Sequence, residues 1–327
     1  MNLPADLLKK LESGALVLTA NKRLSRYLES QYESLKVSAG ATAWMRPAIL
    51  PFEVWCRQQY DLLPDSLPVI NRAQGLLVWE KIVEESVRAS AHALLQVAPT
   101  AEMAWKAEQL LVRYRSAFSQ SDATEDQAMF LQWQAVWRKQ LGRLGMVDSA
   151  AIPALLSDSI DALKPGLPAD IVFAGFDDFD PSLCLLQQRL ENAGCVIANY
   201  QPVYYDDSQK ESLCCPDRNN EIRSCALAAR ELITGNPELR IGIVAPNLKP
   251  YREHIERVFQ AELDPQGSLL RTTDLPVFNI SEAPPLADAP IIHFALRLLR
   301  LNNLVGIDEL GLLLRSPYLS KAEAACF

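Results

Sequence analysis

Residues 170–200 read DIVFAGFDDFDPSLCLLQQRLENAGCVIANY, and their pattern indicates the fold class. The first five residues, DIVFA at 170–174, form a short apolar run that is typical of a buried strand. A helix is expected over 182–193, and CVIANY at 195–200 has the character of a second strand. A strand, a helix and a strand joined by short loops predict a parallel sheet covered by helices, which is the α/β class.

The same alternation begins near the N-terminus. ALVLT at 15–19 predicts a buried strand, and Asn21 is placed to cap the helix that follows it. A second strand is expected near 43–45, after which Pro47 and Pro51 end the unit. A strand followed by a crossover helix is the unit from which parallel sheets are built.

A further alternation lies in the second half of the chain. A helix is expected at 221–234, a strand at 240–245, where the sequence reads RIGIVA, and another helix at 250–263. Two more helical stretches are expected at about 291–301 and 306–315. The pattern predicts a second parallel sheet unit that ends in helices.

Between these segments, residues 52–146 are predicted to be almost wholly helical. The helical stretches are expected at 52–63, 72–90, 101–118 and 125–144. Five of the six tryptophans lie in this region, namely Trp55, Trp79, Trp105, Trp133 and Trp137. Tryptophans can stack on nucleic-acid bases, but Trp79 shares its stripe with aliphatic residues, which favours packing in a core.

The composition is that of a folded globular protein. The 327 residues are 49% hydrophobic and 22% charged, which is too apolar for general disorder. The sequence contains no run of about 18 apolar residues, so no membrane-spanning helix is expected. The N-terminus has lysines and acids where a signal peptide has an apolar stretch. Seven cysteines, an odd number in a long chain, favour a reduced protein, so we expect a cytoplasmic location and no membrane partner.

Charge is distributed unevenly along the chain. The net charge is −8, which argues against a protein that coats nucleic acid with a wholly basic surface. Residues 1–150 contain 17 Lys and Arg against 16 Asp and Glu, a net of +1. Residues 151–327 contain 15 against 24, a net of −9. A local basic groove in the first half is therefore compatible with the sequence.

The motifs of common hydrolases are absent from the sequence. No glycine is followed by lysine, so the chain lacks the P-loop that wraps nucleotide phosphates. No lysine has an acidic residue two positions before it, which removes half of a restriction-type nuclease site. Cys-x-x-Cys pairs and a Gly-x-Ser-x-Gly elbow are also missing. We therefore expect no catalytic residue, no metal and no cofactor in this chain.

The first candidate site is the segment 19–26, TANKRLSR, which follows a predicted strand and opens a helix. Its polar residues are Asn21, Lys22, Arg23 and Arg26. They fall in the first turns, where unpaired backbone N–H groups and the helix dipole attract anions. Three cations in this position would contact the phosphates of a nucleic-acid backbone. The alternative is a solvated helix face beside the core.

The second candidate is the acidic segment 175–181, GFDDFDP, at the carboxyl end of a predicted strand. Asp177 and Asp178 stand where nucleotide hydrolases hold magnesium, but no phosphate-binding loop accompanies them. The simpler interpretation is that Asp180 caps the next helix and that Pro181 is its first residue.

Several stretches together resemble one known family. VLTANKRLSRYLESQYE resembles the strand–helix motif of superfamily-one helicases that touches single-stranded DNA, and FAGFDDFDPSLCLLQQRLENAG resembles the region of their magnesium-binding acid pair. NNEIRSCALAARELITGNPELRIGIVAPNLKPYREHIERVF is similar to the start of a second RecA-like domain. AWMRPAILPFEVW, PVINRAQGLLVWEKIVEES, FNISEAPPLADAPIIHFALRLLRL and LLLRSPYLS are similar to the helical segments of the family.

The order of these stretches is that of bacterial inactivated superfamily-one helicases joined to a RecB-type exonuclease, which are relatives of AddB and RecC. The resemblance implies RecA-like, P-loop NTPase-type parallel sheet domains with a large all-α insertion. It implies a first RecA-like domain at 1–50 and 150–212, a helical insertion at 51–149, the start of a second RecA-like domain at 213–280 and a helical segment at 281–327.

The resemblance also assigns roles to residues. By matched position, the four polar residues of segment 19–26 named above would contact DNA, and the pair Asp177 and Asp178 would be the silent remnant of a metal site. The missing nucleotide-binding lysine fits the inactivated members. The nuclease domain of the family lies C-terminal to these segments, so the resemblance implies that any exonuclease activity belongs to a portion beyond Phe327.

Three hypotheses for function follow. The first is a non-hydrolysing, helicase-like portion of a bacterial DNA repair or recombination nuclease, which holds or guides single-stranded DNA or DNA ends. The second is a protein-interaction scaffold that docks onto a motor or nuclease subunit, which the acidic second half favours. The third is a metabolic α/β enzyme with a site at the strand ends near Gly175 and Pro246.

Overall fold

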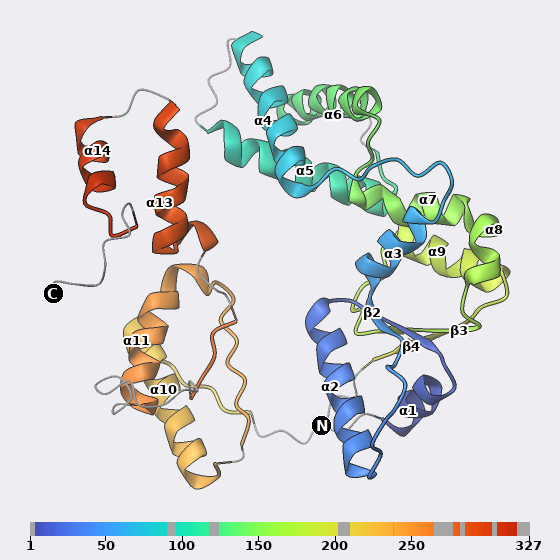
Figure 1. Ribbon diagram of the computed structural model, residues 1–327, viewed down its shortest axis with the longest axis horizontal. Helices are drawn as coiled ribbons and strands as arrows, with labels where there is room; N and C mark the ends of the chain where they lie inside the picture. Colours follow the sequence, from blue (N-terminus) through green and yellow to red (C-terminus); the bar gives the residue numbers. More distant parts are fainter. Residues whose placement is uncertain are drawn as a thin grey trace. The chain divides into compact units, whose positions relative to one another are not determined.

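The chain divides into two compact units, Met1–Asp206 and Asp207–Phe327 (Figure 1). The computed structural model describes residues 4–89, 96–117, 124–201, 210–237, 239–264, 277–281, 285–302 and 306–318. Within these ranges, the first unit combines strands and helices, whereas the second contains helices and irregular segments.

The first unit is built on a parallel β-sheet, which confirms the predicted α/β class. Among the described residues, four strands pair in the order β2-β1-β3-β4. These strands are β1 (Leu16–Thr19), β2 (Ile49–Pro51), β3 (Asp170–Ala174) and β4 (Val196–Tyr200). Val17 lies opposite Ile49 on one side and Val172 on the other, and all three pairings are parallel. Three of the predicted strands are thus present within one residue of their expected bounds.

The second strand differs from the prediction, which placed it near 43–45. β2 begins at Ile49, whose side chain is only 2% exposed, and it includes Pro51. A strand at the edge of a sheet tolerates proline because its outer N–H groups need no partner in the ladder. Met45, by contrast, is 89% exposed, so the predicted segment buries no apolar side. The residue types of 43–45 and of 49–51 did not show which of the two segments would become the strand. The segment that became the strand is the one that pairs with β1 and buries Ile49.

Helices cover both faces of the sheet, because successive strand residues point to opposite sides. Val17 and Val172 pack on one side with α1 (Ala5–Glu12) and α2 (Lys22–Ser38). Leu18 and Phe173 pack on the other side with α3 (Phe52–Asp61), α7 (Ile152–Asp158), α8 (Ile160–Leu163) and α9 (Pro181–Asn192). Figure 1 shows the two groups of helices on opposite faces. Helix α1 was not predicted from the sequence.

A helical body with its own core follows α3 along the chain. It consists of α4 (Arg72–Ala89), α5 (Val97–Tyr114) and α6 (Glu125–Leu144). Four of the five tryptophans predicted for this region lie in its core and are at most 7% exposed, namely Trp79, Trp105, Trp133 and Trp137. Trp55 of α3 is buried in the core of the sheet instead. Core packing, rather than exposure for base stacking, is therefore confirmed for these side chains.

Hydrogen bonds join the helical body to the helices on the sheet. The buried carboxylate of Asp148 accepts from Trp105 Nε1 at 2.6 Å and from the backbone N–H of Ala150 at 2.9 Å. Ser182 Oγ, in the first turn of α9, donates to the backbone oxygen of Val112 in α5 at 3.3 Å. These contacts hold the end of α5 beside the start of α9, which lies at the carboxyl edge of the sheet.

The second unit corrects one prediction. Its helices α10 (Arg218–Gly235) and α11 (Arg252–Leu263) share a core around Ala226 and Phe259. The strand predicted at 240–245 is wrong, because residues 239–245 form neither helix nor strand and Val244 is 91% exposed. A parallel strand needs a hydrogen-bonding neighbour, and no described residue of this unit supplies one. Ile241 nevertheless packs against the core of the two helices.

The last two described helices, α13 (Pro290–Leu299) and α14 (Ile307–Leu314), lie close to their predicted bounds. Both expose apolar side chains, because Leu299 is 74% exposed, Ile307 89% and Leu314 66%. None of the helices in the described part of the chain combines the length and the apolar character that crossing a membrane requires.

Candidate functional site

A cleft with a volume of about 1010 Å³ opens at the carboxyl edge of the sheet. Its walls include the segments that directly follow three strands, which are residues 20–22 after β1, 52–54 after β2 and 175–178 after β3. The two candidate segments of the sequence, around Lys22 and around Asp177, therefore meet in one cleft.

The order of the strands explains why a cleft forms there. β1 lies between β2 and β3, and the chain leaves β1 toward β2 but leaves β3 toward β4. The connecting helices α2 and α9 cover opposite faces of the sheet, so their first turns separate at the boundary between β1 and β3. In open parallel sheets, such a boundary outside the carboxyl ends of the strands is where ligands bind.

The start of α2 is fixed by hydrogen bonds around Asn21. The side chain of Asn21 accepts from the backbone N–H of Leu24 at 2.9 Å, which confirms the predicted helix cap. Thr19 Oγ1 donates to the backbone oxygen of Asn21 at 2.9 Å, and the N–H of Ala20 donates to the oxygen of Ala174 at 3.1 Å. The turn from β1 into α2 is therefore tight and is anchored to β3.

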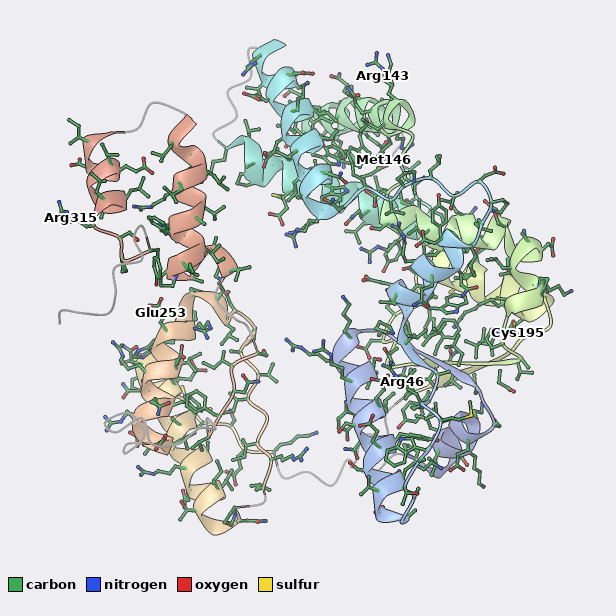
Figure 2. The ribbon with its side chains drawn as sticks, viewed as in Figure 1. Arg46, Arg143, Met146, Cys195, Glu253 and Arg315 are labelled. Atoms are coloured by element: carbon green, nitrogen blue, oxygen red, sulfur yellow. The ribbon has the colours of Figure 1, made fainter. Side chains whose placement is uncertain are left out.

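The three cations of this helix end are all exposed, but they do not share one wall. Lys22 lines the cleft, whereas Arg23 and Arg26 lie outside its lining. No carboxylate of the described residues forms an ion pair with any of them. Arg46, which lies beside the same helix in Figure 2, is instead paired with Glu29 at 2.9 Å.

Gly175 allows the loop after β3 to pass close to α2. Its φ of +71° lies in the left-handed region that favours glycine, and a Cβ at this position would overlap the side chain of Leu24. The backbone N–H of Gly175 donates to the oxygen of Tyr200 at 3.1 Å. The acidic segment is thereby held directly beside the start of α2.

Asp177 and Asp178 both line the cleft, but they have different surroundings. Asp178 Oδ2 accepts a hydrogen bond from the hydroxyl of Tyr114 at 2.6 Å. This hydrogen bond, together with the negative charge of Asp178, raises the pKa of Tyr114. Asp177 has no hydrogen-bond or ion-pair partner among the described residues. No group of three or more His, Cys, Asp or Glu with metal-binding geometry occurs among those residues either.

Asp180 has the simpler role that the sequence suggested for it. Its side chain accepts from the backbone N–H of Leu183 at 2.9 Å, and Pro181 is the first residue of α9. Asp180 is therefore the cap of this helix, as predicted, although it also lines the cleft.

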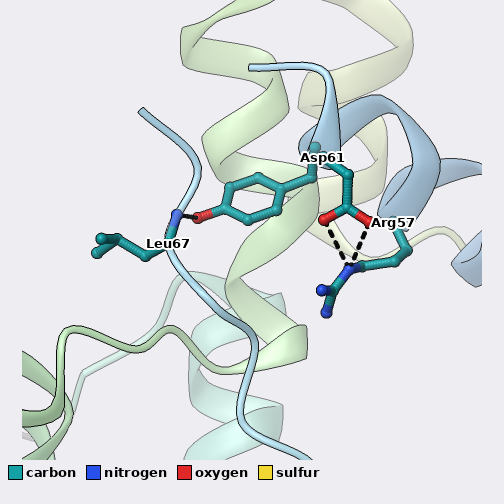
Figure 3. Close-up of polar contacts among 4 residues, drawn as sticks. Arg57, Asp61 and Leu67 are labelled. Atoms are coloured by element: carbon teal, nitrogen blue, oxygen red, sulfur yellow. Dashed lines mark hydrogen bonds and ion pairs between the residues drawn. The ribbon is translucent and has the colours of Figure 1, made fainter. Parts of the chain in front are cut away.

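Three arginines of the cleft were missed by the sequence analysis, namely Arg57, Arg72 and Arg113. Arg57 Nε pairs with the carboxylate of Asp61, at 2.9 and 3.0 Å to its two oxygens (Figure 3). Arg72 pairs with Glu102 at 2.9 Å, whereas Arg113 has no ion-pair partner among the described residues. Each arginine lies in a different helix, and no local sequence motif indicates that it belongs to a site.

A second contact in Figure 3 holds the loop that follows α3. The hydroxyl of Tyr60 accepts from the backbone N–H of Leu67 at 2.9 Å. Tyr60 is only 4% exposed and belongs to the core of the sheet. This contact anchors the segment that connects α3 to the helical body.

The cleft combines four cationic and four acidic side chains, so its formal charge is balanced. The cations are Lys22, Arg57, Arg72 and Arg113, and the acids are Glu53, Asp177, Asp178 and Asp180. The geometry defines the protein as an α/β protein with a charged cleft at the carboxyl edge of a parallel sheet.

No protein-family model and no curated protein matches its sequence.

Proposed function

We propose that this chain is the non-hydrolysing, helicase-like DNA-binding portion of a bacterial DNA repair or recombination nuclease. In this proposal, the sheet of the first unit is the core of a RecA-like domain, and α2 holds single-stranded DNA or a DNA end through Lys22, Arg23 and Arg26. The parallel order of the sheet and the cleft at its carboxyl edge are compatible with such a domain.

The observation that carries the proposal is a set of exposed cations without ion-pair partners at the start of a helix. Lys22, Arg23 and Arg26 occupy the first five residues of α2, and no described carboxylate neutralises them. The positive end of the helix dipole adds to their field. Phosphates of a single strand are anions that such a group would attract without reading the base sequence.

The local geometry also supports the absence of ATP hydrolysis. β1 ends at Thr19 and α2 begins at Lys22, so only Ala20 and Asn21 connect them. A P-loop places roughly six residues and a Gly-Lys pair at this point, so that backbone N–H groups wrap the phosphates. A two-residue connection that is already hydrogen-bonded to β3 lacks the length to do so.

The test is single-stranded DNA binding measured by fluorescence anisotropy at several salt concentrations. Each phosphate contact contributes about 0.7 to the slope of log K against log salt for single strands, so Lys22→Glu with Arg23→Glu should reduce the slope by about 1.4 or more. The matched control is Lys139→Glu with Arg143→Glu on α6, which does not line the cleft. Figure 2 shows Arg143 on this helix.

Two results would reject the proposed DNA site. The first is weak binding that does not change with salt concentration. The second is an equal loss of binding in the α2 variant and in the α6 control, because that result would reflect total charge rather than a site. Circular dichroism of both variants checks that their helix content is unchanged.

A second candidate function is a scaffold that docks onto a motor or nuclease subunit. The apolar exposure of α13 and α14 favours it, because Leu299, Ile307 and Leu314 are each more than half exposed. Capture of purified subunits from recombination nucleases, compared between the wild type and Leu299→Glu with Leu314→Glu, tests this function. Equal capture by both proteins, or no capture by either, argues against it.

A further inference from the structure

Trp44 differs from the other tryptophans of the chain in its exposure. The other five are at most 7% exposed and belong either to the core of the sheet or to that of the helical body. Trp44 is 36% exposed, and the next residue, Met45, is 89% exposed. Neither side chain takes part in an apolar core of the described residues. The fold therefore leaves one indole ring accessible to a ligand.

The segment that carries Trp44 lies beside the helix with the unpaired cations. Arg46, two residues after Trp44, pairs with Glu29 of α2 at 2.9 Å (Figure 2). Arg26 precedes Glu29 by three residues, and side chains at this spacing are neighbours on one helix face, with about 5–6 Å between their Cβ atoms. β2, which begins three residues after Arg46, holds the same segment to the sheet. Trp44 is thus held near α2 by an ion pair and by strand pairing.

Charge alone gives this face of α2 only a modest attraction for phosphates. Lys22, Arg26, Glu29 and Glu33 follow one another at spacings of four, three and four residues, so they share one face of the helix. Arg46 neutralises Glu29, and Glu33 offsets part of the field of the two remaining cations. A strand held on this face therefore needs a contribution that does not depend on charge. Stacking on an aromatic ring is such a contribution, because every base has a face that can stack.

We propose that Trp44 is a stacking platform for a base of single-stranded DNA, on a strand whose phosphates contact the cations of α2. This inference rests on the proposed function, and it names the residue that holds a base rather than a phosphate. The contact accepts any base, since stacking does not read the hydrogen-bonding edges. The bases of a duplex are already stacked and paired, so Trp44 also gives the protein a preference for single strands.

The experiment compares two strands of equal length and charge, an oligothymidylate and an abasic deoxyribose phosphate strand, in anisotropy titrations with the full chain. We expect the wild type to bind the oligothymidylate about fivefold or more tightly, which is the range of one stacked base. Trp44→Ala should remove this preference and leave the affinity for the abasic strand unchanged. The slope of log K against log salt should not change, because no phosphate contact is lost.

Two further variants serve as controls. Trp44→Phe keeps an aromatic ring and should retain most of the preference for the strand with bases. Leu77→Ala removes an exposed apolar side chain from α4, at a position that is 65% exposed, and should bind both strands as the wild type does. Acrylamide quenching of tryptophan emission gives an independent readout. Oligothymidylate should shield the exposed indole in the wild type, and this shielding should be absent in Trp44→Phe.

The outcomes separate this inference from the proposed function. Equal binding of both strands by the wild type overturns the stacking platform and leaves the phosphate contacts of α2 intact. An equal loss of affinity for both strands in Trp44→Ala also overturns it, because that loss reflects altered structure rather than a missing stack. Absence of binding to either strand rejects the inference together with the proposed function. Thermal unfolding of each variant establishes that it is folded.

Discussion

At the scale of single residues, Gly175 controls how the two halves of the cleft approach one another. Its left-handed backbone is strained for any other residue, and a Cβ at this position would overlap the end of the Leu24 side chain, which would have to move. We expect Gly175→Ala to lower the free energy of unfolding by about 1–3 kcal/mol, because an L-residue is strained at this φ and its Cβ meets Leu24. Chemical denaturation measures the loss.

The control for Gly175 is a glycine inside a helix. Gly142 lies in α6, its φ is not positive, and a Cβ added there would meet only open space. Gly142→Ala should raise stability by about 0.5–1 kcal/mol, because alanine loses less backbone entropy in a helix. Destabilisation by both substitutions, or by neither, would contradict this account of Gly175.

Asp217 is a residue at which pH should change stability. It caps α10, and the backbone N–H of Asn220 donates to its carboxylate at 2.8 Å, which lowers the pKa of Asp217 below its usual value of 3.8. A lowered pKa in the folded state means that the charged cap stabilises α10 above pH 3.8. This contribution is lost as the pH falls through the lower folded value.

The measurement for Asp217 is the difference in unfolding free energy between the wild type and Asp217→Asn from pH 6 to pH 3. The difference should be constant near pH 6 and should shrink as the pH falls below the usual aspartate value. A difference that grows toward low pH would contradict the hydrogen bond as its cause.

At the scale of elements, the first turn of α2 combines a stabilising cap with the proposed DNA contacts, and two substitutions separate these roles. Asn21→Ala removes the acceptor for the N–H of Leu24 and should cost about 1 kcal/mol of stability. Asn21→Asp keeps the cap but adds a negative charge beside Lys22, so it should preserve stability and weaken DNA binding. Stability and anisotropy are measured on both variants. Equal DNA affinity in Asn21→Asp and the wild type would contradict the placement of DNA at this helix end.

The helix ends could be predicted from the sequence more reliably than the strands. The helix caps at Asn21 and Asp180 were predicted, because a cap depends on residues within three positions in the chain. The edge strand was misplaced, and the run at 240–245 did not form a strand. Both errors have the same cause: a strand is completed by hydrogen bonds from a distant segment, and an apolar run does not specify that segment.

At the scale of the whole molecule, the first unit contains everything that the proposed DNA site needs. Its sheet core and its helical core are formed by its own residues, and the whole lining of the cleft lies between residues 20 and 183. We expect a fragment of residues 1–206 to fold cooperatively and to bind single-stranded DNA with the salt dependence of the full chain. Circular dichroism, denaturation and anisotropy test this expectation, and a fragment that is unfolded in isolation would contradict it.

Features that depend on neighbours along the chain could be predicted from the amino-acid sequence. Hydrophobic periodicity indicated the α/β class, most helices and three of the strands, and the polar residues at strand ends marked the two segments that meet in the cleft. Tertiary packing, by contrast, selected the apolar run that joined the sheet edge, and it brought Arg57, Arg72 and Arg113 to the same cleft as Lys22. The difference arises because local propensity acts over a few residues, whereas strand pairing and a shared cleft depend on the packing of segments that are far apart in sequence.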